Sequence, residues 1–134
     1  MSDDRGGFAA RLRVCRCGGQ AAAGYLQQAL MGYRELGSQD GEADVLNGLG
    51  EVFLATGCLT DAHANHDAAL RLAAQISQKH EQARAHHGLA RTHQASGEPG
   101  KARHHWQEAL ALYTDLGAPE ADHARAQLTA PAAG

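Results

Sequence analysis

Five of the nine histidines lie in one stretch, His86 to Tyr113, which also contains a Gly-Lys pair. Histidine is the commonest metal ligand and proton carrier near neutral pH, and a Gly-Lys pair ends the loop that binds nucleotide phosphates. The stretch therefore indicates one of three things: a metal site, a phosphate-binding loop, or histidines that only pack and face solvent. The residue spacing distinguishes them.

The Gly-Lys pair does not fit a phosphate-binding loop. That loop has the pattern G-x-x-x-x-G-K-[ST], in which backbone N–H groups hold phosphate and the final hydroxyl binds magnesium. Here Gly100-Lys101 is followed by Ala102, which has no hydroxyl, and Ala95 stands where the first glycine belongs. We therefore expect no nucleotide site in this segment.

A metalloprotease site fails for a similar reason. His80-Glu81 begins like the zinc motif H-E-x-x-H. The second ligand position, however, is Arg84, whose guanidinium is a permanent cation and cannot bind zinc. Carboxylates elsewhere are better explained as solvated helix faces, and we assign no catalytic residue.

Two further histidine pairs, His63 with His66 and His104 with His105, could share a metal ion across neighbouring helices. A zinc site takes three or four ligands, and no thiol or carboxylate obviously completes this set. A histidine-rich metal-binding module remains an alternative function. We expect instead no metal ligand and no cofactor, with most histidines facing solvent and His66 and His93 filling half-buried positions.

Composition limits the remaining classes of function. The 134 residues fit one domain, and 43% of them are apolar while only 4% are aromatic. Because many of the apolar residues are alanine, close helix packing is favoured over a sheet. The net charge of −3 gives no general field for nucleic acid, and no apolar run is long enough for a membrane span. We expect a helical protein that is not an enzyme and has no direct nucleic-acid or membrane partner.

The cysteines predict the compartment. Cys15, Cys17 and Cys58 are too few and odd in number for a disulfide framework, and Cys15-x-Cys17 has no second pair that would complete a zinc site. The first residues lack the apolar core of a secretory signal. These features favour the cytoplasm.

The chain repeats with a period of 40 residues. Apolar residues coincide without gaps when the sequence is shifted by that distance, as in Ala22, Ala62 and Ala102; Ala29, Ala69 and Ala109; Leu30, Leu70 and Leu110. Glycines, and once Ser77, follow the apolar segments, where a left-handed residue ends a helix. Pro99 and Pro119 stand where helices begin. The pattern predicts helices at 20–36, 41–56, 60–76, 80–96, 100–116 and 119–129.

The alternation of small and large residues within each unit resembles the tetratricopeptide repeat (TPR) family, over roughly residues 20–129. The matching residues are Leu49-Gly50, Leu89-Ala90, Phe53, His93, Ala62, Ala102, His66, Trp106, Ala69-Leu70 and Ala109-Leu110. The chain departs from the family in its 40-residue period, in the missing proline after the second helix, and in having His93 and Pro99 at aromatic positions. Its alanine-rich units are similar to TPR arrays of actinobacterial regulators, including antibiotic regulatory proteins and STAND-type signalling ATPases.

The resemblance implies an all-α fold, a right-handed superhelix of antiparallel helix pairs that forms an α-α solenoid. It implies a TPR-like domain at 20–129, made of a half repeat at 20–36, repeats at 43–76 and 83–116, and a capping helix at 119–129. Residues 1–19 are expected to be poorly ordered or a degenerate first helix, and residues 130–134 a tail.

The family binds peptides on its concave face, which the first helix of each repeat lines. The corresponding positions here are Asp44, Asn47, Glu51, Leu54, Arg84, His87, Arg91 and Gln94. Acid and amide in the first repeat and base in the second favour a protein or peptide of mixed charge, or an acidic segment. Alternatively these charges only pair with each other, Asp44 with Arg84 or Glu51 with Arg91, which stabilises by about 0–1 kcal/mol per exposed pair.

A second interaction surface is expected where a convincing first helix is missing. Tyr25, Leu26, Leu30 and Tyr33 would be only partly covered, so this edge is predicted to dock on a preceding domain or to self-associate as a homo-oligomer. The sequence therefore predicts a protein- or peptide-binding TPR module, the sensing or scaffolding part of a bacterial transcriptional or signalling regulator. A segment that only mediates oligomerisation is the other alternative.

Overall fold

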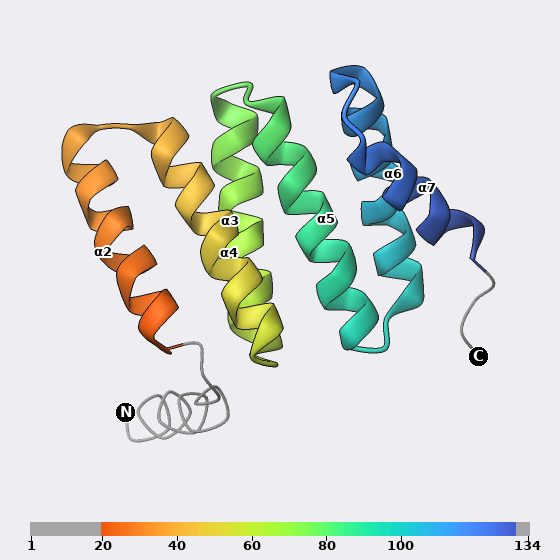
Figure 1. The fold of residues 1–134 in the computed structure, drawn as a ribbon, viewed down its shortest axis with the longest axis horizontal. Helices are drawn as coiled ribbons and strands as arrows, with labels where there is room; N and C mark the ends of the chain where they lie inside the picture. Colours follow the sequence, from red (N-terminus) through yellow and green to blue (C-terminus); the bar gives the residue numbers. More distant parts are fainter. Residues whose placement is uncertain (1–19, 131–134) are drawn as a thin grey trace.

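The computed structural model describes residues 20–130, and every regular element in that range is a helix. The helices are α2 (Gln20–Leu36), α3 (Gln39–Ala55), α4 (Leu59–Gln75), α5 (Lys79–Ala95), α6 (Pro99–Leu116) and α7 (Glu120–Thr129) (Figure 1). None of these helices is both long and apolar enough to cross a bilayer. The predictions for residues 1–19 and for the tail after residue 130 lie outside the described residues.

The helices end at evenly spaced left-handed residues. Gly37, Gly57, Gly97 and Gly117 have positive φ, and Ser77 has φ 55°. After each of them the next backbone N–H donates to a carbonyl five residues earlier, at 2.8–2.9 Å. This pattern is the Schellman motif, which satisfies the last carbonyls of a helix. The left-handed residues recur every 20 positions, so each 40-residue unit holds two helices, as predicted.

The helix starts agree with the sequence to within two residues. Ser38 caps α3, because its hydroxyl accepts a hydrogen bond from the Gly41 backbone N–H at 3.3 Å. Pro99 occupies the first turn of α6, where a missing N–H costs nothing. Pro119 differs slightly from the prediction, since it precedes α7 and Glu120 is the first helical residue.

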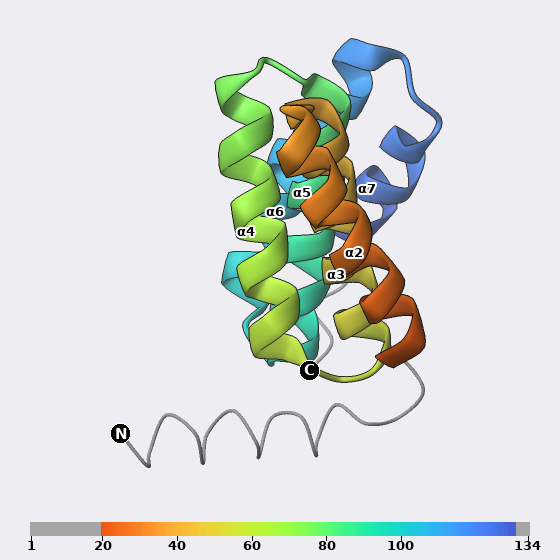
Figure 2. The same ribbon diagram turned by 90° about the vertical axis from the view of Figure 1, so that its left-hand side faces the viewer.

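Consecutive helices pack against each other, and α3 also contacts α5. The helices stand side by side from α2 to α7 (Figure 1), and seen from the α2 end, α4 and α7 lie on opposite sides (Figure 2). The chain is thus a solenoid of helical hairpins, and the predicted fold class is confirmed.

Alanine allows the helices to approach closely, and one larger residue fills the space in each unit. The fully buried alanines include Ala43, Ala62, Ala69, Ala83 and Ala109. The larger residues lie at a single repeat position of the second helices, which holds Leu26, then His66, then Trp106. His66 and Trp106 are among the largest fully buried side chains, and Leu26 is half-buried. The small-and-large alternation seen in the sequence therefore builds the core.

Candidate functional site

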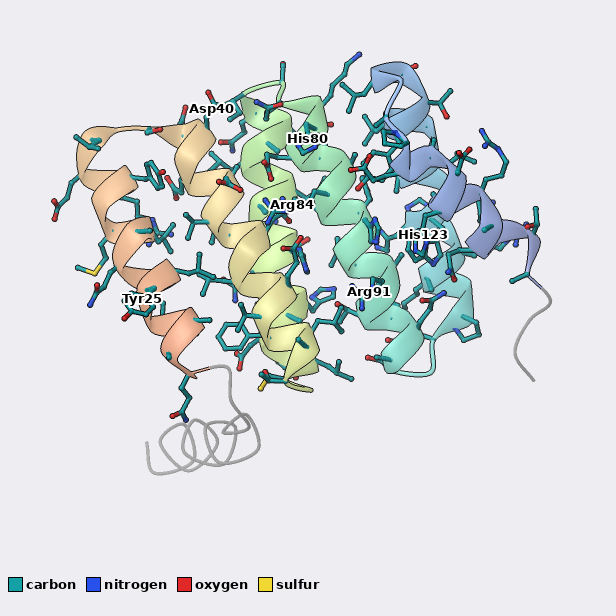
Figure 3. The ribbon with its side chains drawn as sticks, viewed as in Figure 1. Tyr25, Asp40, His80, Arg84, Arg91 and His123 are labelled. Carbon is teal, nitrogen blue, oxygen red and sulfur yellow. The ribbon has the colours of Figure 1, made fainter. Side chains whose placement is uncertain are left out.

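Two adjoining pockets open along the first helices of the repeats. The central pocket, of about 450 Å³, is lined by Glu51, Leu54, His66, His80, Arg84, His87, Gly88, Arg91, Tyr113 and Glu120. The C-terminal pocket, of about 370 Å³, is lined by His87, Arg91, Gln94, Trp106, His123 and Gln127. Because they share His87 and Arg91, the two pockets form one groove over α3, α5 and α7 (Figure 3).

The structure brings six of the eight sequence-predicted groove residues into this lining. These are Glu51, Leu54, Arg84, His87, Arg91 and Gln94. The other two lie elsewhere. Asp44 is exposed beside the groove and is paired with Arg84 at 2.6 Å.

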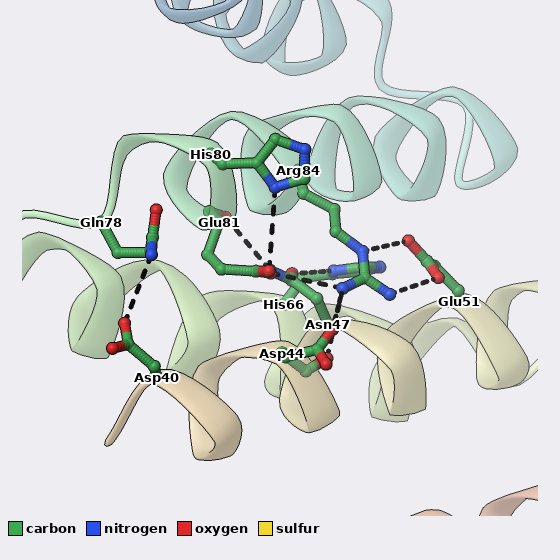
Figure 4. Close-up of polar contacts among 9 residues, drawn as sticks. All are labelled: Asp40, Asp44, Asn47, Glu51, His66, Gln78, His80, Glu81 and Arg84. Carbon is green, nitrogen blue, oxygen red and sulfur yellow. Dashed lines mark hydrogen bonds and ion pairs between the residues drawn. The ribbon is translucent and has the colours of Figure 1, made fainter. Parts of the chain in front are cut away.

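Asn47 is fully buried, so its prediction as a groove surface residue is corrected. Its amide nitrogen donates to the backbone carbonyl of Glu81 at 3.1 Å and to the Glu81 carboxylate at 2.9 Å. Its amide oxygen lies 2.8 Å from Nδ1 of His66. Asn47 therefore joins the first helices of two repeats and the helix between them (Figure 4). Buried polar groups need such partners, which explains an amide here.

Arg84 is the hub of an ion-pair network in the central pocket. Its guanidinium contacts both carboxylate oxygens of Glu51, at 2.8 and 2.9 Å, and Asp44 and Glu81 at 2.6 and 3.3 Å. The hydrogen bond that Arg84 donates to Glu51 is the main reason that the pKa of Arg84 is raised. Burial would raise the pKa of Glu51, but the hydrogen bond and charge of Arg84 hold it below its usual value. The predicted alternative of cross-repeat pairing is thus realised at Arg84.

Arg91, by contrast, makes no ion pair with any residue of the described range. The sequence offered Glu51 as its partner, but Glu51 binds Arg84. The Arg91 side chain is exposed and lines both pockets. The C-terminal pocket has no carboxylate in its lining at all. The groove therefore has one neutralised cation and one cation available to a ligand.

His66 forms the floor of the central pocket and is fully buried, whereas the sequence predicted a half-buried position. Since the amide nitrogen of Asn47 is used by Glu81, its oxygen accepts and Nδ1 of His66 donates. Nε2 is then a bare acceptor, and it has no hydrogen-bond partner among the described residues. Burial lowers the pKa of His66 to about 4, against a smaller opposing effect of Glu51. His66 is therefore neutral near pH 7.

Rings stack in the C-terminal pocket. The imidazoles of His87 and His123 are nearly parallel, at 10° with centroids 5.3 Å apart, and Trp106 meets His87 edge-on at 4.9 Å. Burial lowers the pKa of His87 to about 4, and the positive charges of His123 and Arg91 act in the same direction.

The groove residues His123 and Gln127 were missed by the sequence analysis, which treated α7 only as a cap. A signal was available for Gln127. Shifting the predicted positions Asn47 and His87 by another 40 residues gives Gln127. No such shift identifies His123, whose equivalents are Ala43 and Ala83.

A second group of histidines joins α4, α5 and α6 outside the groove. His93 stacks on His105 at 4°, His63 meets His93 edge-on, and Nδ1 of His86 lies 3.0 Å from Nδ1 of His105. His93 is nearly buried and also bonds Glu98 at 3.1 Å. Within residues 20–130 no three potential ligands are arranged to hold a metal ion. The metal-binding alternative therefore gains no support from this cluster.

The predicted self-association edge is divided between core and surface. Leu30 is buried against α3, so it is not an edge residue, which corrects that prediction. Leu26 and Tyr33 are half-buried and pack on the same core. Only Tyr25 is largely exposed, at the outer side of α2 (Figure 3).

The fold and the groove agree with one family of proteins. The family model described as tetratricopeptide repeat matches residues 41–115, which is more than half of the chain and runs from the first turn of α3 to the last turn of α6. Among curated proteins, no sequence matches the chain. Two-helix units, a core of alternating small and large residues and a groove along the first helices agree with this match. The chain belongs to the tetratricopeptide repeat family.

Proposed function

We propose that the protein binds an extended segment of a partner protein in the groove over α3, α5 and α7. TPR repeats generally mediate protein–protein interaction. In this chain the central and C-terminal pockets are continuous and together offer a guanidinium, imidazoles, amides and an indole. An elongated concave site lined by so many hydrogen-bonding groups suits the backbone and polar side chains of a peptide.

The observation that carries the proposal is Arg91, which forms no ion pair with any residue between 20 and 130. In the central pocket, by contrast, Glu51 is already paired with Arg84, which Asp44 and Glu81 also contact. A partner gains little there, because it would have to replace existing ion pairs. Where Arg91 faces the C-terminal pocket, a carboxylate would find a cation in a lining without acidic residues, and charge-assisted hydrogen bonds are the stronger ones. The ligand is accordingly a segment with at least one acidic side chain at this point.

In the cell, we propose, this module senses or scaffolds within a bacterial transcriptional or signalling regulator, in the cytoplasm. The support is the resemblance of its alanine-rich 40-residue units to the TPR arrays of such regulators. The described surface also carries no dominant charge of one sign that would favour nucleic acid as the ligand.

The test is selection of ligands from a library of unstructured peptides on the immobilised chain, followed by affinity measurement. Arg91→Glu is compared with Arg71→Glu, a matched charge reversal at an exposed residue of α4 that pairs with Asp67 and lines neither pocket. We expect acidic peptides whose affinity falls at least about tenfold with Arg91→Glu, since such a bond is worth about 1.5–3 kcal/mol. Arg71→Glu should bind like the wild type. Equal binding by all three proteins would refute the proposal.

A further inference from the structure

Exposed large hydrophobic residues concentrate on a single helix. Tyr25, Met31 and Leu36 of α2 are 76%, 62% and 82% exposed. Over the described residues only one other large hydrophobic side chain is exposed, Leu116 at 41%. Scattered apolar residues at a surface need no explanation, but a group of them on one helix indicates a contact surface.

The repeats themselves show which face of α2 lacks a neighbour. Four positions are buried in both later second helices: Ala62, His66, Ala69 and Ala73 in α4, and Ala102, Trp106, Ala109 and Tyr113 in α6. At the equivalent positions of α2, Ala22 is exposed, and Leu26, Ala29 and Tyr33 are only half-buried. α4 lies between α3 and α5, whereas α2 packs mainly on α3. Among the helices of residues 20–130, none covers this face of α2 as α3 and α5 together cover α4.

The residues along this open face follow the spacing of a helix-pairing seam. Ala22, Tyr25, Ala29, Gly32 and Leu36 are separated by three, four, three and four residues. That spacing is the a/d pattern with which two helices interlock. Ala22, Ala29 and Gly32 are small, and a Cβ added at Gly32 would meet nothing within 4 Å. A second helix can therefore approach closely.

We propose that α2 pairs with α2 of a second copy of this chain, antiparallel about a two-fold axis at Ala29. In that arrangement residues whose numbers sum to 58 face each other, because 29 + 29 = 58. Leu36 then meets Ala22 of the partner subunit, so that a large side chain faces a small one at each end of the seam. Ala29 meets Ala29 of the partner subunit at the centre. The antiparallel helix dipoles also attract.

In the 40-residue register, the sequence before residue 20 has Arg5 at the position of the buried Val45 and Arg13 at that of the half-buried Phe53. A guanidinium group is unfavourable in an apolar contact. A second α2 supplies apolar residues at the contact instead. This inference does not depend on the peptide groove, which lies on other helices.

The first test is sedimentation equilibrium of the full chain from micromolar to millimolar concentration. We expect a monomer–dimer equilibrium, weakened at least tenfold by Leu36→Glu. The matched control is Leu116→Glu, the same substitution at the same repeat position on α6, and it should dimerise like the wild type. Both residues are exposed, so circular dichroism should show both variants folded. A wild-type chain that stays monomeric throughout, or equal dimerisation of both variants, overturns the proposal.

The second test fixes the direction of pairing. Ala22→Lys and Leu36→Glu should each weaken self-association, because each puts a charge into the seam. When the two variants are mixed, they should form a heterodimer at least tenfold more stable than either homodimer. In that heterodimer one of the two contacts between positions 22 and 36 joins the new Lys to the new Glu, and the other is the wild-type contact between Ala22 and Leu36. A parallel pairing brings position 22 against position 22 and predicts no such rescue. Absence of the heterodimer would therefore contradict the antiparallel arrangement.

Discussion

The buried ring of His66 determines which neighbouring positions must be glycine. Its ring lies between α3 and α5, and a Cβ added at Gly50 would come within 2.5 Å of the ring. An added Cβ at Gly88 would overlap the ring as well. Gly48, which occupies the same repeat position as Gly88, faces Leu26 at an ordinary 3.5 Å. Glycine is therefore needed at position 88 and not at the equivalent position 48.

We predict that Gly88→Ala lowers the free energy of unfolding by about 1–3 kcal/mol, because the added methyl overpacks the core. Gly48→Ala is the matched control. It should be neutral or stabilise by up to about 1 kcal/mol, since alanine favours the helix. Urea denaturation of both variants measures the difference. Equal effects of the two substitutions would show that the His66 ring does not occupy the space described.

Buried histidines make stability depend on pH. The pKa values of His66, His87 and His105 are each about 4 in the folded chain, chiefly because of burial, against about 6.5 when unfolded. Below pH 6.5 the unfolded chain therefore binds more protons, and stability falls as the pH drops from 6.5 towards 4. The pKa of Glu51 is lowered, so Glu51 changes the free energy of unfolding only at more acidic pH.

We predict that the free energy of unfolding falls between pH 7.5 and 5.5, by about 1.4 kcal/mol from His66 alone. Denaturant titrations at the two pH values measure this change. His66→Phe should make the pH dependence smaller. Equal stability at the two pH values would contradict the burial of neutral histidines.

At the level of elements, the end of α4 differs from the other helix ends. It carries Ser77 in the left-handed conformation where the other four turns have glycine. A side chain in that conformation costs about 1–2 kcal/mol relative to the right-handed region, and glycine avoids the cost.

We predict that Ser77→Gly raises the free energy of unfolding by about 0.5–1 kcal/mol. Ser96→Gly is the control, because Ser96 has φ −84° and its hydroxyl donates to the Thr92 carbonyl. That substitution should destabilise the chain. Thermal unfolding of both variants measures the signs. A loss of stability with Ser77→Gly would show that its strain is offset by contacts of the hydroxyl.

The helices were predictable because their ends are decided by nearby residues. Gly57 and Gly97 end helices through their own φ, and Ser38 caps α3 through an N–H three residues away. Asn47 was placed wrongly because its environment depends on residues 19 and 34 positions away. Whether Glu51 forms its ion pair with Arg84 or with Arg91 depends on side-chain geometry between repeats. Sequence spacing alone does not predict that geometry.

For the whole molecule, the groove combines charges from three first helices. Arg84, from the second repeat, is held by Glu51 and Asp44 of the first, which joins the repeats and neutralises the central pocket. α7 completes the other pocket with His123 and Gln127, and the Gln127 side chain bonds Gln94 at 3.1 Å. The segment expected to be only a cap thus extends the groove beyond Arg91.

The most direct measurement uses Trp106, the single tryptophan, whose indole lines the C-terminal pocket. An acidic peptide selected on the chain is titrated in while the indole N–H resonance and the backbone resonances are followed by NMR. We predict that the indole resonance and those around Arg91 and His123 shift in proportion to binding, while residues near Arg71 do not. Saturation by the peptide with the indole unchanged and shifts confined to the outer faces of α4 and α6 would contradict binding in the groove.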